Sequence, residues 1–164
     1  MDVDIEESPM RNPEKYLSYK AAWERIDSAL GDGYWLEAIT LCESIMADRL
    51  LSYVKGVDPE ARLYLRTSFG KLIERWRASA GDSLLQAKGD LGGQVDGWRE
   101  QRNEAVHGFV KSEPGTPTPP VDEFLILVKE TAEKGRELAR RVSDWHMAEL
   151  RRAKATKKKA ALNP

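Results

Sequence analysis

The feature that most constrains the fold is a long run of apolar residues with helical spacing in the last third of the chain. From Val121 onward, alternating steps of three and four residues connect Leu125, Val128, Ala132, Gly135, Ala139, Val142 and His146. A second seam runs through Phe124, Leu127, Thr131, Leu138 and Trp145. Such spacing places residues on one side of an α-helix. A long helix with two apolar seams packs either against several helices of its own fold, or against its own fold and a second subunit.

Shorter helical patterns fill the chain before this helix. Asn12-Pro13-Glu14 combines an N-cap residue, a proline at the first helical position and an acid in the first turn, and therefore predicts a helix start. Glycines at Gly31-Asp32-Gly33 predict its end. Further helices are predicted over about 34–54, over 61–80 with an interruption near Thr67-Ser68, and from near Gln94 to near Gly108.

Two breaker-rich segments separate these helices. Residues 81–93 contain four glycines and predict a loop that can hold one short turn around Leu84 to Ala87. Residues 112–120, SEPGTPTPP, cannot be helical because of their prolines. No strand pattern competes with the helical interpretation. We therefore predict an all-α bundle of four or five helices with a long C-terminal helix, spanning residues 12–150.

The two ends of the chain differ in charge. Residues 1–11 predict a disordered acidic tail. Residues 151–164 predict a disordered basic tail, with six bases and no acid between Arg151 and Lys159. This tail either binds RNA phosphates weakly or is merely solvated. The N-terminus lacks the basic and apolar blocks of a signal peptide, and no apolar run approaches the ~18 residues of a membrane span. We therefore predict a cytoplasmic protein without a membrane partner.

Charge and cysteine content narrow the function classes. The 164 residues carry a net charge of −1, so the whole molecule is not an electrostatic nucleic-acid binder and any such site must be a local patch. The single cysteine, Cys42, excludes an intramolecular disulfide and a cysteine-based zinc site. Its apolar helical setting predicts a buried, inert thiol. No cluster of carboxylates and histidines predicts a metal, and no cofactor is predicted.

The segment from Trp98 to Lys111, WREQRNEAVHGFVK, carries the residues most suited to chemistry. On a continuous helix Arg99, Asn103 and His107 share one face, while Arg102 points about 100° away from Asn103. Arg102 and His107 therefore converge only if the helix ends between them or if two copies of the segment meet across a dimer. Arg99 and Lys111 are predicted to contact RNA phosphates, or equally to be solvated.

An arginine beside an imidazole can cleave RNA without a metal. His107 can take the proton from a 2′-hydroxyl, and the resulting oxygen attacks the adjacent phosphorus. Arg102 can hold the non-bridging oxygens, and Asn103 can hydrogen-bond His107 or the phosphate. The products carry a 2′,3′-cyclic phosphate and a 5′-hydroxyl.

RNEAVH, from Arg102 to His107, resembles the motif of the HEPN superfamily, in which an arginine, four to six residues and a histidine follow one another. The residue after the arginine is commonly polar, as Asn103 is. The central helix EAITLCESIMADRLLSYV also resembles that family, and the likeness covers roughly residues 13–150. It implies a homodimeric, metal-independent endoribonuclease, with Arg102, Asn103 and His107 as the catalytic positions. It also implies a role as a toxin or phage-defence effector with an antitoxin or defence-system partner.

One position departs from a subset of that family. In members paired with a nucleotidyltransferase antitoxin, a tyrosine two residues after the histidine receives the modification. Phe109 stands there and has no hydroxyl. Silencing by that route is therefore not expected for this chain.

Other interpretations stay open. Arg141 and His146 repeat the same spacing within the long helix, where a structural role for His146 is favoured. Asp48, Arg49 and Glu43 form a buried ion pair or support the cleft, with the structural role favoured. The whole chain can instead be an inactive HEPN-like binding or scaffold module, or a regulator that neutralises a partner through its C-terminal helix.

Overall fold

The computed structural model describes residues 12–108 and 110–163, and these ranges form helices and loops without a strand. In the described residues the helices are α1 (Pro13–Asp32), α2 (Trp35–Val57), α3 (Phe69–Ala80), α4 (Asp82–Gln86), α5 (Leu91–His107) and α6 (Val121–Leu162). This confirms the all-α class and the long C-terminal helix. The six helices exceed the predicted four or five because the short turn near Leu84 forms α4.

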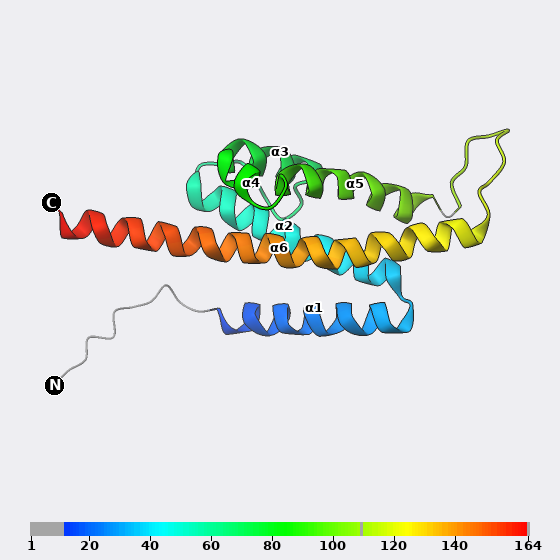
Figure 1. Ribbon diagram of the computed structural model, residues 1–164, viewed down its shortest axis with the longest axis horizontal. Coiled ribbons are helices and arrows are strands. Elements are labelled where there is room, and N and C mark those ends of the chain that lie inside the picture. Colours follow the sequence, from blue (N-terminus) through cyan, green and yellow to red (C-terminus); the bar gives the residue numbers. More distant parts are fainter. Residues whose placement is uncertain (1–11, 109, 164) are drawn as a thin grey trace.

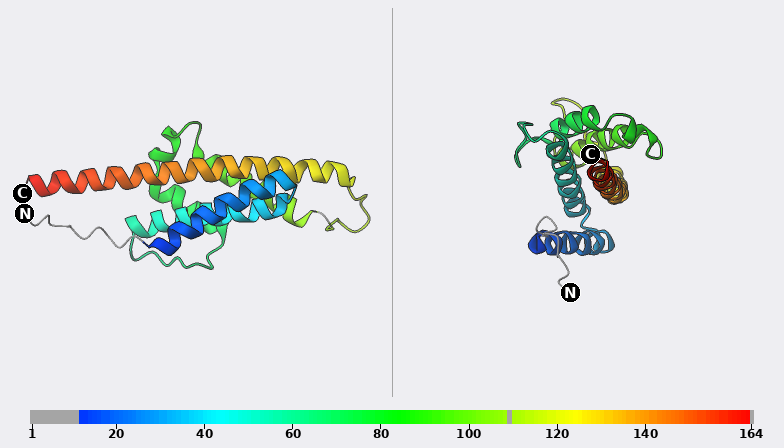
Figure 2. Two further views of the ribbon diagram at one scale, coloured as in Figure 1. Left: turned by 90° about the horizontal axis from the view of Figure 1, so that it is seen from below. Right: turned by 90° about the vertical axis from the view of Figure 1, so that its left-hand side faces the viewer.

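The helix α6 is the longest of the described helices, and α2 and α5 pack along it (Figure 1). Figure 2 shows α1 on one side of α2, with α3, α4 and α5 on the opposite side. The turn between α1 and α2, the C-terminal end of α5 and the N-terminal end of α6 lie at the same end of the molecule (Figure 1). This end carries the predicted catalytic segment.

Capping side chains explain where several helices begin. The Asn12 side chain accepts a hydrogen bond from the Lys15 backbone N–H at 3.0 Å, as the predicted helix start requires. The prediction of helix over 61–80 is wrong for its first part, because α3 begins only after its N-cap, Ser68. Asp90 accepts from the Gly93 N–H at 3.0 Å, so α5 begins at Leu91, earlier than predicted.

Both apolar seams of α6 pack mostly against other helices of the same chain. Of the first seam, every residue from Val128 to His146 is buried, whereas Leu125 is 41% exposed. Of the second seam, Thr131, Leu138 and Trp145 are buried. Because α2 and α5 cover most of both seams, the fold does not need a second subunit to bury them.

A tryptophan from α5 anchors that helix on α6. The buried Trp98 indole donates its Nε1–H to the Thr131 carbonyl oxygen at 2.8 Å. Gly135 makes room for the ring, since a Cβ there would lie 2.7 Å from Trp98 Cζ2. This contact fixes the position of α5, and with it the catalytic segment, relative to α6.

Cys42 lies in the centre of this core. It is fully buried on α2, and burial raises the pKa of its thiol to about 12. The thiolate, which is the nucleophilic form, is therefore scarce near neutral pH. This confirms that the thiol is buried, as the sequence predicts.

The C-terminal segment differs from its prediction. Residues 151–162 continue α6 as an exposed helix, where the sequence was expected to be disordered. Alanine, lysine and arginine are strong helix formers, and no glycine or proline interrupts this stretch. The predicted acidic tail, residues 1–11, lies outside the described residues. Among the described helices, α6 included, none is both long and apolar enough to cross a lipid bilayer.

Candidate functional site

The motif residues from Arg102 to His107 lie on one unbroken helix. The helix α5 runs from Leu91 to His107, and the Gly108 N–H closes its last turn on the Glu104 carbonyl oxygen at 2.7 Å. The five residue steps from Arg102 to His107 therefore turn the two side chains about 140° apart around the helix axis. Of the two arrangements that would make these side chains converge, a helix end between them is excluded. Convergence then requires a second copy of the segment.

Arg102 is held in place at the contact between α5 and α2. Its guanidinium forms an ion pair with Glu43 through Nη2, and its Nη1 donates to Asn103 Oδ1 at 2.7 Å. The side chains of Arg102 and Glu43 are only 19% and 22% exposed. The Nε of Arg102 is buried without a hydrogen-bond partner in the part of the chain that the structure describes. Arg102 is therefore a fixed, partly shielded cation.

Asn103 binds Arg102 in this structure. Its side-chain oxygen accepts from Arg102, and no hydrogen bond joins it to His107 among the described residues. The predicted role of orienting the imidazole is therefore not the arrangement seen. Because Glu43 and Asn103 bind the two terminal nitrogens of Arg102, the guanidinium plane has a defined orientation.

The ion pair of Glu43 reaches across 59 positions of sequence. The sequence predicts that Glu43, Asp48 and Arg49 form an ion pair or support the cleft, and it indicates no partner on α5. The structure instead pairs Asp48 with Lys15 at 2.9 Å and with the Tyr19 hydroxyl. Of the three residues, only Glu43 is seen to pair with a residue of the motif, Arg102, within the part of the chain that the structure describes. The only sequence signal for it was its place at the edge of the apolar stripe of α2.

His107 is exposed at the last position of α5. Within the described residues it makes no hydrogen bond and no ion pair, so its imidazole is open to a ligand or to a second chain. A basic residue at this position also interacts favourably with the helix dipole, which is the purely structural role that a C-terminal histidine can have. The neighbouring Phe109, which departs from the family pattern, lies outside the described residues.

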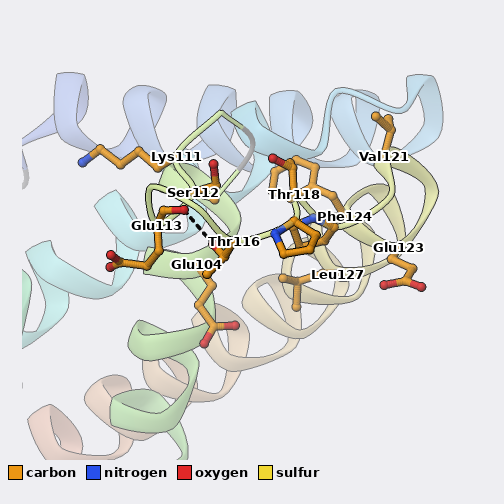
Figure 3. Close-up of a pocket in the computed structure, with 13 residues that line it drawn as sticks. Glu104, Lys111, Ser112, Glu113, Thr116, Thr118, Val121, Glu123, Phe124 and Leu127 are labelled. Carbon is orange, nitrogen blue, oxygen red and sulfur yellow. Dashed lines mark hydrogen bonds between the residues drawn. The ribbon is translucent and has the colours of Figure 1, made fainter.

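A pocket of about 520 Å³ opens between the end of α5, the loop 112–120 and the start of α6, and His107 is not among the residues that line it (Figure 3). Lys111 lies at its edge and points away from Phe124 (Figure 3). The pocket is lined by one lysine and by three carboxylates, those of Glu104, Glu113 and Glu123. This acidic lining disfavours a phosphate inside the pocket. Lys111 is thus exposed near the site, but it is not part of a basic cleft.

Arg99 does not join His107. Its Nε donates to Asp96 Oδ1 at 3.1 Å, and it also forms an ion pair with Glu100. Its side chain lies beside Gly70 of α3. Because two carboxylates already compensate its charge, Arg99 is a weaker phosphate ligand than the sequence suggests.

The second copy of the motif has structural contacts. Arg141 donates to Gln94 Oε1 and to the Lys88 carbonyl oxygen, both at 2.6 Å, and so ties α6 to the segment before α5. His146 is buried, and its Nδ1 has no partner among the described residues. Burial, followed by the nearby Arg49 cation, lowers the pKa of His146 to about 4. His146 is therefore a neutral core histidine near pH 7, in agreement with the favoured structural role.

In residues 12–108 and 110–163, no group of three or more histidine, cysteine, aspartate or glutamate side chains is arranged to hold a metal ion. Comparisons with protein families, curated proteins and solved structures found no match for this chain.

Proposed function

We propose that this protein is a HEPN-type endoribonuclease that cleaves RNA through a composite site formed by two copies of the chain. The observation that carries the proposal is the contrast between two side chains of α5. Arg102 is fixed and half-buried by Glu43 and Asn103, whereas His107 is exposed and unpaired among the described residues. A fixed cation and an accessible proton acceptor are the two groups that RNA transesterification needs.

A homodimer completes this site. Because Arg102 and His107 point about 140° apart on one helix, one copy cannot aim both at a single phosphate. A two-fold axis beside α5 places two copies of each residue in one cleft. The same end of the molecule exposes large apolar side chains, among them Val106, Leu125 and Ile126, which are 40%, 41% and 58% exposed. Exposed apolar surface of this kind favours self-association.

The chemistry at such a site follows from these two residues. His107 accepts the 2′-hydroxyl proton as the 2′-oxygen attacks the adjacent phosphorus. The bond from phosphorus to the 5′-oxygen breaks, and that oxygen leaves with a proton supplied by an imidazolium. Arg102 stabilises the negative charge that grows on the non-bridging oxygens. The products are a 2′,3′-cyclic phosphate and a 5′-hydroxyl.

A toxin or defence role fits an enzyme of this kind, because uncontrolled RNA cleavage stops growth. We propose an antitoxin or another defence-system protein as the partner that holds it in check. Phe109 has no hydroxyl to modify, so this control acts by another route than tyrosine modification.

The first test is cleavage of total cellular RNA by the purified protein in EDTA. We expect the wild type to cut and to leave cyclic-phosphate ends, and we expect His107→Ala to lose cutting by about 100-fold or more. Gln101→Ala, an exposed change on the same helix, is the matched control and retains full activity. Equal cutting by wild type and His107→Ala would refute the site.

A second function is favoured by one observation. Both terminal nitrogens of Arg102 are already occupied by Glu43 and Asn103, which is also what an inactive HEPN-like binding or scaffold module would show. That function predicts no growth arrest on expression. It also predicts that neither Arg102→Ala nor His107→Ala weakens binding to a protein partner.

A further inference from the structure

The charge of this chain is strongly segregated along α6. Six of the 26 basic residues lie between Arg151 and Lys159, a segment without acids. The rest of the chain then has 20 basic residues against 27 acidic ones, a net charge of −7. A nearly neutral protein is therefore an acidic body with a basic helical extension.

This basic extension, residues 151–162, projects past the body of the molecule. All of its residues are exposed, and Figures 1 and 2 show it continuing beyond α2, α3 and α4. Arg152 pairs with Glu149. The other bases of the extension make no ion pair within the described residues: Arg151, Lys154, Lys157, Lys158 and Lys159. Five uncompensated cations thus lie on an exposed stretch of α6.

The spacing of these cations places them close to one another. Arg151, Lys154 and Lys158 are separated by three and four residues and share one helix face, with Lys157 beside them. Like charges at such spacing destabilise a helix by about 0.2–0.5 kcal/mol per pair. The helix dipole compensates only within the last turn, where Lys159 lies. Arg151 and Lys154 lie earlier, so helix stability does not account for them.

The chemistry of the extension favours one kind of partner. Its remaining residues are alanines, one threonine and a terminal leucine, Leu162. A helix that binds a membrane surface needs a broad apolar face, and a protein interface needs large apolar anchors. The extension has neither. Clustered lysines and arginines without apolar anchors suit the phosphate backbone of a nucleic acid.

We propose that the basic extension of α6 is a sequence-independent docking surface for RNA. The choice of RNA as the strand rests on the proposed function. The extension begins about 40 Å along α6 from Phe124, which lies beside Gly108 at the end of α5. It therefore holds a distant part of a long substrate and contributes nothing to the reacting phosphate.

A hollow at the base of the extension continues this surface onto the body. It measures about 400 Å³, lies between α2 and α6, and is lined by Tyr53, His146, Arg152 and Lys157 among others. Four residues of the extension, Arg152, Ala153, Thr156 and Lys157, thus border a space beside the body. A strand that follows the extension can lie against the C-terminal end of α2 there.

The test measures binding of a fluorescent single-stranded 30-nucleotide RNA by anisotropy, with full-length His107→Ala protein so that no cutting occurs. The test variant carries five further changes to glutamine, at Arg151, Lys154, Lys157, Lys158 and Lys159. A matched control removes five exposed cations of the body that form no ion pair with any described residue, at Lys55, Arg62, Arg66, Arg75 and Lys129. Circular dichroism verifies that both variants keep their helix content.

We expect the extension variant to lose roughly tenfold or more in affinity, while the body control changes little. The slope of log affinity against log salt should become shallower by about 0.7 for each phosphate contact removed. Equal binding by the extension variant and its parent would overturn the proposal. So would an equal loss in the body control, or extension-dependent binding to phosphatidylserine vesicles without binding to RNA. Binding through the extension by a wild type that cleaves nothing would refute the proposed function and leave this inference standing.

Discussion

At the scale of single residues, the proposed site depends on the contacts that orient the side chain of Arg102. Arg102 gains its orientation from an acid on α2 and an amide on its own helix. An arginine with two fixed partners retains less rotamer freedom than a solvated one. Under the proposed function, Glu43 is therefore a positioning residue, which acts on RNA only through Arg102.

Glu43→Gln tests this role. We expect cleavage to fall by about tenfold, mainly through kcat, because Arg102 loses the partner that fixes its guanidinium. We also expect the free energy of unfolding to fall by about 1–2 kcal/mol, because a partly buried cation loses its counter-charge. Glu37→Gln on the same helix removes an exposed ion pair with Arg25 and should change both quantities little. Undiminished cleavage by Glu43→Gln would remove Glu43 from the site.

The burial of His146 predicts how the free energy of unfolding depends on pH. Its pKa is lowered from the ordinary 6.5 to about 4, chiefly by burial and then by the Arg49 cation, with Lys15 acting in the same direction and Asp48 in the opposite one. Between these values the unfolded chain binds a proton that the folded chain does not. Stability from this group is therefore complete above pH 6.5 and is lost as pH falls to about 4, by at most about 3 kcal/mol.

Urea unfolding at pH 7 and pH 4.5 measures this loss. His146→Gln cannot titrate, so its loss between the two pH values should be smaller than that of the wild type. An identical loss in both proteins would show that other groups, such as the carboxylates, carry the whole effect.

At the scale of helices, the contact between α5 and α6 determines where the catalytic segment lies. The Trp98 indole lies over Gly135 and is hydrogen-bonded to Thr131, so a rigid ring occupies the space where a side chain would stand. A glycine in the middle of a helix costs about 0.5–1 kcal/mol relative to alanine. At Gly135 this cost is offset by the close approach of the ring.

Gly135→Ala should therefore destabilise the protein by about 1–3 kcal/mol, because its Cβ would meet the ring at 2.7 Å. Gly97→Ala is the matched change on the exposed face of α5, where a Cβ meets nothing within 4 Å. It should stabilise the protein by about 0.5–1 kcal/mol. Thermal unfolding of both variants distinguishes a steric effect from helix propensity, and a stabilised Gly135→Ala would show that Trp98 can move aside.

At the scale of the whole molecule, the two ends differ in surface chemistry, and the two proposals assign them different tasks. One end carries His107, exposed apolar side chains and a pocket, which suits a dimer that completes the site. The other end carries the basic extension. Because the long α6 connects them, a dimer formed at one end keeps its two extensions away from the site, where they can hold the flanks of a long RNA.

Mixing two inactive variants tests the composite site. The shared cleft of the dimer contains two Arg102–His107 pairs, each with its arginine from one copy and its histidine from the other. In a heterodimer of Arg102→Ala with His107→Ala, one of these two pairs stays intact. Random mixing should then restore about a quarter of the wild-type cleavage. Sedimentation should show dimers at the same concentrations. Absence of rescue in a mixture that forms heterodimers would place both residues of a site on one chain.

The sequence by itself determined most of the helices and the residues of the motif. Periodic apolar positions, N-cap residues and glycines are local signals, so α1, α2, α5 and α6 and the all-α class could be predicted from them. The segment 61–68 was predicted wrongly because Leu63, which is buried, continues the apolar pattern without being helical. The prediction of a disordered basic tail was wrong for residues 151–162, because it gave more weight to their charge than to their high helix propensity.

Only the tertiary structure decided which groups meet. The ion pair between Glu43 and Arg102, the burial of His146 and the compensation of Arg99 by Asp96 and Glu100 depend on how side chains are placed once the helices pack. Periodicity states which face of a helix is apolar, but not which residue of another helix lies opposite. The reason is physical: a helix is stabilised by neighbours three and four residues away, whereas an ion pair 59 positions apart exists only after the core has formed.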